Sequence, residues 1–220
     1  FMVDAVSSLA CSEYRHDDWG VDITVSASQK GLMLPPGLSF NAVSEQALEY
    51  SRSSTAQHSY WRWDAILENN QRGYFPYTPN TNLLYGLDEA LNLLHREGLT
   101  KVIARHARLA EATRHAVAAW GLENVCLNPE EYCNSTTAVL VPEGYDADQL
   151  RRIILERFNM SLGTGLGRLK GAIFRIGHIG DFNELMLAGT LSGVEMGLAL
   201  ADIPHSSGGV DAALKFLTTE

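Results

Sequence analysis

Short apolar stretches separated by turn residues characterise the first part of the chain. Residues 1–6, 21–26 and 37–42 are each rich in apolar or β-branched side chains and are bounded by Gly, Pro, Asp or Ser. Runs of this length and setting are typical of buried strands. Ser44 followed by Glu45 then indicates the start of a helix. We therefore predict that this region forms part of an α/β sheet.

Helical periodicity dominates the middle of the chain. Leucines at positions 83, 84, 87, 91 and 94 fall on one face of a helix that is expected to end at Gly98. A second helix is predicted from Thr100 to Trp120, because Gly121 is a typical residue just beyond a helix end. The chain is therefore expected to form two successive helices before its hydrophobic pattern changes.

After Gly121, strands and helices alternate. The elements are expected at residues 136–141, 146–158, 172–176 and 182–200. The last helix carries Gly189, Gly193 and Gly197 four residues apart, a spacing that permits close approach of a neighbouring element. This alternation predicts a small α+β domain.

Composition narrows the class of protein and of partner. The 220 residues are 45% hydrophobic and 20% charged, which is typical of a globular protein. Lys and Arg number 17 against 26 Asp and Glu, a net charge of −9, which argues against nucleic acid or an anionic membrane as the main partner. No apolar run approaches the roughly 18 residues of a membrane span.

The cysteines indicate a reducing compartment. Cys11, Cys126 and Cys133 are odd in number and lack C-x-x-C spacing, which argues against a disulfide framework or a structural zinc site. The acidic segment 14–18 has no second cluster at metal-binding spacing, so we expect a solvated loop and no metal. The glycine-rich segment 163–167 lacks the G-x-G-x-x-G pattern and is expected to be a flexible loop.

From the cysteine usage we predict a cytoplasmic protein.

Lys30 is the strongest candidate for chemistry. The strand predicted at 21–26 runs into small and polar residues and then Lys30, one of only four lysines in the chain. A lysine at the carboxyl end of a strand, partly withdrawn from water, is suited to attack an aldehyde. A solvated loop lysine is the more common state, and the pattern by itself leaves both open.

Two separated stretches carry a family resemblance. The segments VDITVSASQKGLMLPPGL at 21–38 and RLKGAIFRIGHIGDFNELMLAGTLSGVEMGL at 168–198 resemble the class V aminotransferases, within the serine–glyoxylate and alanine–glyoxylate branch. The resemblance extends from the first residue to about Leu200. It implies the fold type I of pyridoxal-phosphate-dependent transferases, an α/β fold. Residues 1–120 are then expected to form the later part of the large cofactor-binding domain with connecting helices, and residues 121–220 the small C-terminal α+β domain.

The resemblance implies pyridoxal 5′-phosphate as cofactor and assigns residues to it. Lys30 matches the lysine that forms the Schiff base and acts as general base. Asp4 matches the aspartate that pairs with the pyridine nitrogen, and Val6 is expected to pack beneath the ring. Gln29 is expected near the cofactor phosphate.

The loop YFPYTP resembles a family loop that reaches the partner's cofactor phosphate in a homodimer. Thr78 matches its threonine, and Tyr74 is taken as its tyrosine. Tyr77 also lies near, and Phe75 falls at the equivalent spacing, so the identity of the tyrosine stays open at this point. The resemblance therefore implies a homodimer with shared active sites.

Two residues of the second stretch have expected roles. Arg175 matches the arginine that binds the substrate α-carboxylate, a task suited to a planar guanidinium because it can donate two parallel hydrogen bonds. His178 nearby is expected to be structural.

The implied activity is transamination of serine or alanine with glyoxylate or a similar keto acid. Intact family members are longer, so the chain is expected to be a C-terminal portion with little activity alone. Two alternatives stay open: a lyase or desulfurase of the same fold, and a non-catalytic fragment that only associates.

Overall fold

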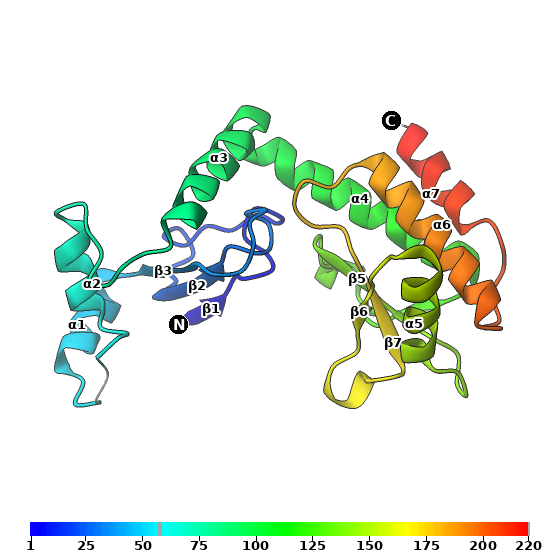
Figure 1. The fold of residues 1–220 in the computed structure, drawn as a ribbon, viewed down its shortest axis with the longest axis horizontal. Helices are drawn as coiled ribbons and strands as arrows, with labels where there is room; N and C mark the ends of the chain where they lie inside the picture. The colour runs from blue at the N-terminus through cyan, green and yellow to red at the C-terminus, as the bar shows by residue number, and fades with distance from the viewer. Residues whose placement is uncertain (57–58, 220) are drawn as a thin grey trace. The chain divides into compact units, whose positions relative to one another are not determined.

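The computed structural model describes residues 1–56 and 59–219 (Figure 1). Its contacts divide the chain into two compact units. The first comprises Phe1–Leu9 and Glu13–Arg96, and the second comprises Ala10–Ser12 and the chain from Glu97 onward. The expected domain division at residue 121 stays a prediction. Within the described chain, the helix before that point packs with the second unit.

The first unit contains a three-stranded sheet. Its strands, in the spatial order β1-β2-β3, are β1 (Met2–Asp4), β2 (Ile23–Ala27) and β3 (Ser39–Val43). β1 runs parallel to β2, with Asp4 opposite Val25, whereas β3 is antiparallel to β2. Parallel pairing places the carboxyl ends of β1 and β2 at the same edge of the sheet. The three strands expected from the sequence are therefore confirmed, with bounds shifted by a few residues.

Three helices complete the first unit. They are α1 (Glu45–Ser53), α2 (Trp63–Asn70) and α3 (Thr81–Glu97). Ser44 caps α1 as expected, because its Oγ accepts a hydrogen bond from the backbone N of Ala47 at 3.2 Å. Helix α2 was not predicted; it has no side-chain cap and buries no residue. The leucine face of α3 is only partly covered, since Leu94 is buried but Leu91 is 39% exposed.

The second unit is a four-stranded antiparallel sheet with four helices. The strands, in the order β4-β5-β7-β6, are β4 (Glu123–Asn124), β5 (Thr136–Leu140), β7 (Ile173–Gly177) and β6 (Gly163–Thr164). The helices are α4 (Leu99–Trp120), α5 (Ala147–Phe158), α6 (Glu184–Leu200) and α7 (Gly209–Thr218), with 3-10 turns η1 (Pro129–Glu131) and η2 (Gly167–Leu169). β4, β6, α7 and both 3-10 turns were not predicted. The expectation of a flexible loop at 163–167 is wrong in part, because β6 and the first residue of η2 lie in this segment. The other elements lie within two residues of their expected bounds. None of the described helices combines the length and apolarity needed to cross a bilayer.

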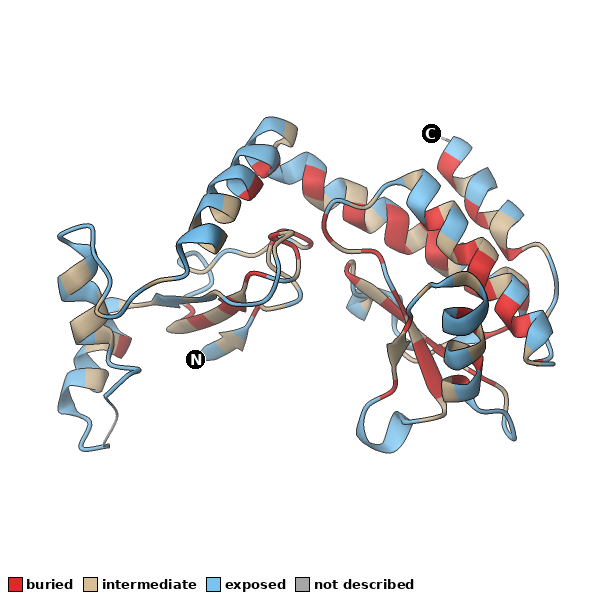
Figure 2. Ribbon diagram, in the orientation of Figure 1, coloured by how far each residue is buried: buried red, intermediate tan, exposed pale blue. Residues whose placement is uncertain are grey.

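One apolar core lies between this sheet and its helices. Figure 2 shows the buried positions of α4, α5 and α6 turned toward the strands. Trp120, Phe174, Leu150 and Leu191 are fully buried members of this core. Its largest members come from helices and strands alike, so the second unit has a core of its own.

Two of the three spaced glycines allow close packing of α6. A Cβ at Gly193 would lie 2.7 Å from Met160 Cε, and a Cβ at Gly197 would overlap the side chain of Ile154 on α5. Gly189 faces open space. The predicted close approach is therefore confirmed at Gly193 and Gly197 and is wrong at Gly189.

Candidate active site

A buried serine fixes the turn that carries Lys30. Ser28 follows β2 directly and is completely buried. Its Oγ donates to the Pro35 carbonyl at 2.8 Å and accepts from the Leu38 backbone N at 3.1 Å. Its backbone N also donates to the Leu38 carbonyl at 3.1 Å. The chain on both sides of Lys30 is thus tied to a single buried side chain.

The turn itself is tight and locally strained. The Met33 backbone N donates to the Lys30 carbonyl at 2.9 Å, and Met33 has a φ of +62°, a conformation that costs a non-glycine residue about 1–2 kcal/mol. Such strain is maintained only where the surrounding structure holds it, which is common at functional sites. Lys30 is half-buried, and its amine forms no ion pair with residues 1–56 or 59–219. The backbone of Lys30 is therefore held while its amine stays free.

Asp4 lies at the same edge of the sheet as Lys30. It is the last residue of β1, and its Oδ1 accepts a hydrogen bond from the Val6 backbone N at 2.9 Å. The Asp4 side chain is exposed and Val6 is half-buried. Since β1 and β2 are parallel, Asp4 and Lys30 both follow carboxyl ends, which is where ligands bind to α/β sheets. Gln29, beside Lys30, is exposed at this edge.

The loop before α3 presents its side chains to solvent. Tyr74 is 70% exposed, and Thr78 is also exposed. Tyr77 differs, because its ring stacks on Tyr60 at a centroid distance of 4.9 Å. Tyr74 has no ring partner in the part of the chain that the structure describes. Tyr74 and Thr78 are therefore available to a group outside this chain.

Arg175 lies near the edge of the second unit's sheet. It is in β7, opposite Ala138 of β5 and Gly163 of β6. Its Nε donates to the Thr164 carbonyl at 2.9 Å. None of the described carboxylates forms an ion pair with this half-buried guanidinium. Its two terminal nitrogens can therefore serve a carboxylate ligand.

His178 is a satisfied core histidine. Its Nδ1 lies 2.9 Å from the Asn134 carbonyl, and its Nε2 lies 2.9 Å from the Thr137 hydroxyl. Complete burial lowers the pKa of His178 to about 4, so the ring is neutral at physiological pH. A neutral ring that donates from Nδ1 and accepts at Nε2 uses both nitrogens internally. This geometry supports the structural role expected for His178.

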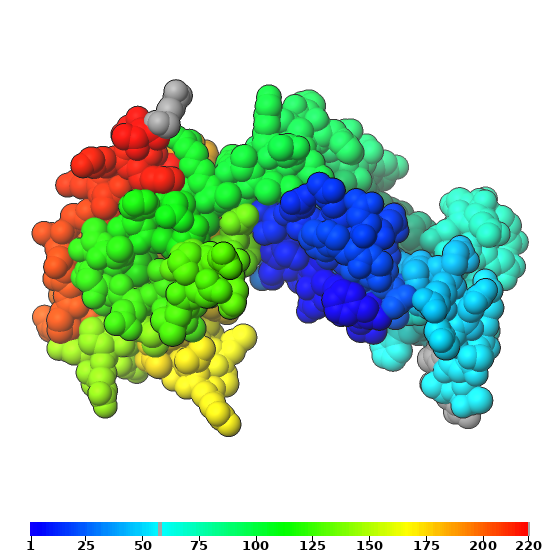
Figure 3. Space-filling model, turned by 180° about the vertical axis from the view of Figure 1, so that it is seen from behind, coloured from blue at the N-terminus to red at the C-terminus, as the bar shows by residue number. Residues whose placement is uncertain are grey.

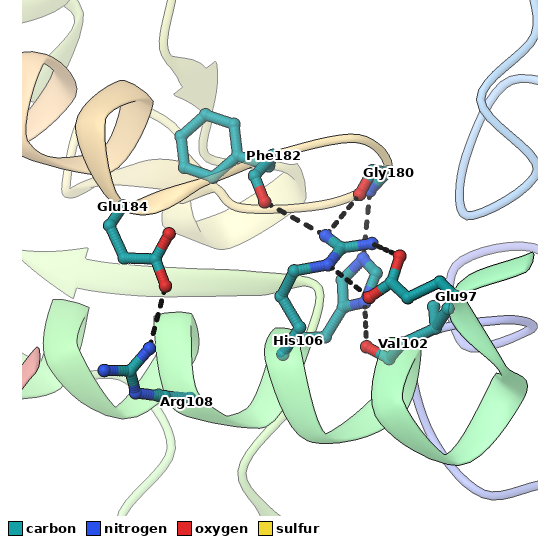
Figure 4. A network of polar contacts seen from close by, with 8 residues as sticks. Glu97, Val102, His106, Arg108, Gly180, Phe182 and Glu184 are labelled. Atoms are coloured by element: carbon teal, nitrogen blue, oxygen red, sulfur yellow. Dashed lines mark hydrogen bonds and ion pairs between the residues drawn. The ribbon is translucent and has the colours of Figure 1, made fainter. Parts of the chain in front are cut away.

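An arginine on α4 holds the segment between β7 and α6, a feature missed in the sequence. Arg105 forms an ion pair with Glu97 through two hydrogen bonds, with Nε–Oε1 at 2.8 Å and Nη2–Oε2 at 3.0 Å. Its Nη1 also donates to the carbonyls of Gly180 and Phe182, at 2.9 and 3.0 Å. Figure 4 labels its partners Glu97, Gly180 and Phe182. The hydrogen bonds from Arg105 hold the pKa of the Glu97 carboxyl below its ordinary value.

His106 completes this clamp. Its Nδ1 lies 2.7 Å from the Val102 carbonyl, and its Nε2 accepts from the Gly180 backbone N at 3.0 Å. Burial lowers the pKa of His106, which favours the neutral form that this acceptor role needs. No local pattern signals the clamp, because Gly180 and Phe182 lie more than 70 residues from Arg105 and His106 in the chain.

The chain resembles known proteins over almost its whole length. The family model described as Aminotransferase class-V matches residues 1–168. The chain is 46% identical over 218 residues to a serine–glyoxylate aminotransferase of Arabidopsis thaliana, covering 98% of this chain and 54% of that protein. A serine–glyoxylate aminotransferase of Methylorubrum extorquens is 45% identical over 221 residues, and the match covers 98% of this chain and 55% of that protein. The chain thus spans about half the length of these curated relatives.

Solved structures agree with the sequence comparison. Pyridoxamine–pyruvate aminotransferase from Mesorhizobium loti superposes with a TM-score of 0.91 at 32% identity, covering 98% of this chain and 56% of that one. Ureidoglycine–glyoxylate aminotransferase from Bacillus subtilis superposes with a TM-score of 0.90 at 27% identity, and the match covers 99% of this chain and 57% of that one. The expected fold type I, an α/β fold, is confirmed. The chain therefore belongs to the aminotransferase class-V family.

Proposed function

We propose that the protein containing this chain is a pyridoxal-phosphate-dependent aminotransferase that acts on a small amino acid, serine or alanine, and on glyoxylate or a similar keto acid. The observation that carries the proposal is the location of Lys30 and Asp4 at one carboxyl edge of a parallel strand pair. The similarity to serine–glyoxylate aminotransferases supports the choice of substrates.

The donor set at this edge suits pyridoxal phosphate. The cofactor presents an aldehyde, a ring nitrogen and a phosphate, and the edge offers the Lys30 amine, the Asp4 carboxylate and the Gln29 amide. Half-buried Val6 follows Asp4 and provides an apolar surface for a ring. When bound, the cofactor supplies an electron-withdrawing ring that stabilises negative charge at the substrate Cα.

Each residue has a distinct task. Lys30 holds the cofactor by its amine and, once substrate is bound, moves the proton at the substrate Cα as general base. The turn fixed by Ser28 keeps the Lys30 backbone in place during this transfer. Asp4, itself held by the Val6 backbone N, keeps a proton on the ring nitrogen. Arg175 binds the carboxylate shared by amino acid and keto acid.

We propose further that the enzyme is a cytoplasmic homodimer in which Tyr74 and Thr78 reach the partner's cofactor phosphate. The exposure of both side chains supports this assignment, and the stacking of Tyr77 on Tyr60 favours Tyr74 over Tyr77. In the assembled protein, residues 1–120 would belong to the large cofactor-binding domain and residues 121–220 to the small domain.

The cofactor is tested by absorbance in the full-length protein. We expect a visible band of bound pyridoxal phosphate that is lost in Lys30→Ala and retained in Lys101→Ala, whose side chain is exposed on α4. A band that survives in Lys30→Ala would contradict the proposed role of Lys30.

The reaction is tested separately with L-serine and L-alanine in the absence of keto acid. Conversion of the cofactor to pyridoxamine phosphate, reversed by glyoxylate, is the expected result. Release of pyruvate and ammonia from serine without the pyridoxamine form would identify a lyase instead.

A further inference from the structure

A chain of polar contacts connects Arg175 to helix α5. We propose that Thr164 and Asp148 are positioning residues for Arg175 and that, together with Gly163, they set the affinity of the enzyme for substrate carboxylates. This inference rests on the proposed role of Arg175 as the carboxylate-binding residue.

The contact with Thr164 orients the guanidinium. Arg175 Nε donates to the Thr164 carbonyl at 2.9 Å, across the pairing of β6 with β7. A guanidinium has five N–H groups in one plane, so engaging Nε fixes the plane. Neither terminal nitrogen has a hydrogen-bond partner among residues 1–56 and 59–219, so both can donate to the two oxygens of a carboxylate. The backbone of β6 therefore determines the direction in which Arg175 can bind a carboxylate.

Gly163 provides the space for this arrangement. A Cβ there would lie 3.1 Å from Arg175 Cβ and 3.2 Å from Arg175 Nε. Gly163 does not have a positive φ, so an alanine would be tolerated by the backbone. A side chain at Gly163 would therefore press against the Arg175 side chain where it passes over β6.

Thr164 is in turn anchored to α5. Its Oγ1 donates to Asp148 Oδ1 at 2.9 Å, and the same oxygen accepts from Arg151 Nη1 at 2.7 Å. Arg151 Nε donates to the Leu162 carbonyl at 2.8 Å, just before β6. The hydrogen bonds from Thr164 and Arg151 hold the pKa of the Asp148 carboxyl below its ordinary value, since both favour the carboxylate form that accepts them.

These anchors matter because β6 has only two residues and lies at the edge of the sheet. A two-residue edge strand makes few ladder hydrogen bonds, and the loop with η2 that follows projects from the surface of its unit, in yellow (Figure 3). Releasing Thr164 from Asp148 would let β6 and the Thr164 carbonyl shift. The Arg175 guanidinium would then lose its fixed plane and bind both carboxylate substrates less tightly.

The test compares substrates with and without a carboxylate in the full-length holoenzyme. The variants are Thr164→Val and Gly163→Ala. We expect KM for L-serine and for glyoxylate to rise about tenfold while kcat changes less than about threefold. The rate at which hydroxylamine, which has no carboxylate, reacts with the bound cofactor should be unchanged. A purely structural role would alter both kinds of reactivity together.

Matched controls are available in the same unit. Gly177→Ala places a methyl group in open space on β7. Thr190→Val removes a hydroxyl that, within the described chain, donates to the Met186 carbonyl of its own helix. Neither variant should change KM. Unchanged KM in both Thr164→Val and Gly163→Ala would overturn the inference. A fall in hydroxylamine reactivity equal to the loss with L-serine would also overturn it.

Arg175→Lys separates this inference from the proposed function. If Arg175→Lys leaves KM for L-serine unchanged, the carboxylate role of Arg175 is wrong and the positioning role fails with it. If Arg175→Lys raises KM but Thr164→Val and Gly163→Ala do not, only the positioning role is wrong.

Discussion

Glu195 on α6 accepts a hydrogen bond from the indole Nε1 of Trp120, the last residue of α4, at a distance of 2.8 Å. The same carboxylate accepts from the backbone N of Gly208 at 2.8 Å and of Val210 at 3.2 Å, at the start of α7. One side chain therefore connects three helices of the second unit.

Replacing this carboxylate should destabilise the second unit. Glu195→Ala leaves the buried indole N–H and two helix-terminal N–H groups without their acceptor, which should lower the free energy of unfolding by about 2–4 kcal/mol. Urea denaturation followed by tryptophan fluorescence measures this loss. Glu156→Ala, at an exposed position of α5, is the control and should change stability by less than about 0.5 kcal/mol. Equal effects in the two variants would contradict the role of Glu195.

The hydrogen bonds to Glu195 should also make the stability of the second unit sensitive to acid. Burial opposes ionisation, but hydrogen bonds from Gly208, Trp120 and Val210 outweigh it and hold the pKa of Glu195 below its ordinary value. A carboxyl whose folded-state pKa is lowered adds stability above its unfolded pKa, and this stability is lost as the pH falls through the folded value. Denaturation between about pH 7 and pH 3 should therefore show a stability decrease below about pH 4.5 that is smaller in Glu195→Gln. An identical pH dependence in the two proteins would refute this linkage.

The glycines of α6 should respond unequally to alanine. Gly197→Ala forces a methyl group into Ile154, and such overpacking typically costs about 1–3 kcal/mol. Gly189→Ala meets no atom and raises helix propensity, so it should stabilise by up to about 1 kcal/mol. Urea denaturation of both variants gives the comparison, and destabilisation by Gly189→Ala would show that the space beside it is filled in solution.

The three free cysteines should differ in reactivity. Burial is the main cause that raises the pKa of the Cys11 thiol to about 12, whereas Cys133 is exposed. Because the thiolate is the reactive form, iodoacetamide at pH 8 should modify Cys133 in the native protein and Cys11 only after denaturation. Peptide mass spectrometry identifies the sites. Rapid native labelling of Cys11 would show that the segment Ala10–Ser12 opens in solution.

Much of the architecture follows from local chemistry. The Ser44 cap, the glycine at the end of α4 and the β-branched run of β5 each act through neighbours a few residues away, so their elements were predicted to within two residues. The two-residue strands β4 and β6 were missed, because elements so short have little periodicity of their own. Helices α2 and α7 were also missed, and neither begins with a side-chain cap of the kind that Ser44 provides for α1.

The same distinction applies to the candidate site, since some of its features follow from contiguous residues and others do not. Lys30 at the end of a strand, and the motifs that resemble the family, are properties of contiguous residues and could be identified without a structure. The contacts that orient Arg175 could not be identified from the sequence. They come from β6, through the Thr164 carbonyl and the space at Gly163, and from α5, through the Asp148 carboxylate. The sequence by itself therefore determined the family, the expected cofactor chemistry and most elements. Only the tertiary structure decided which polar groups are paired and which glycines make room for a neighbour, since both depend on distances between residues far apart in the chain.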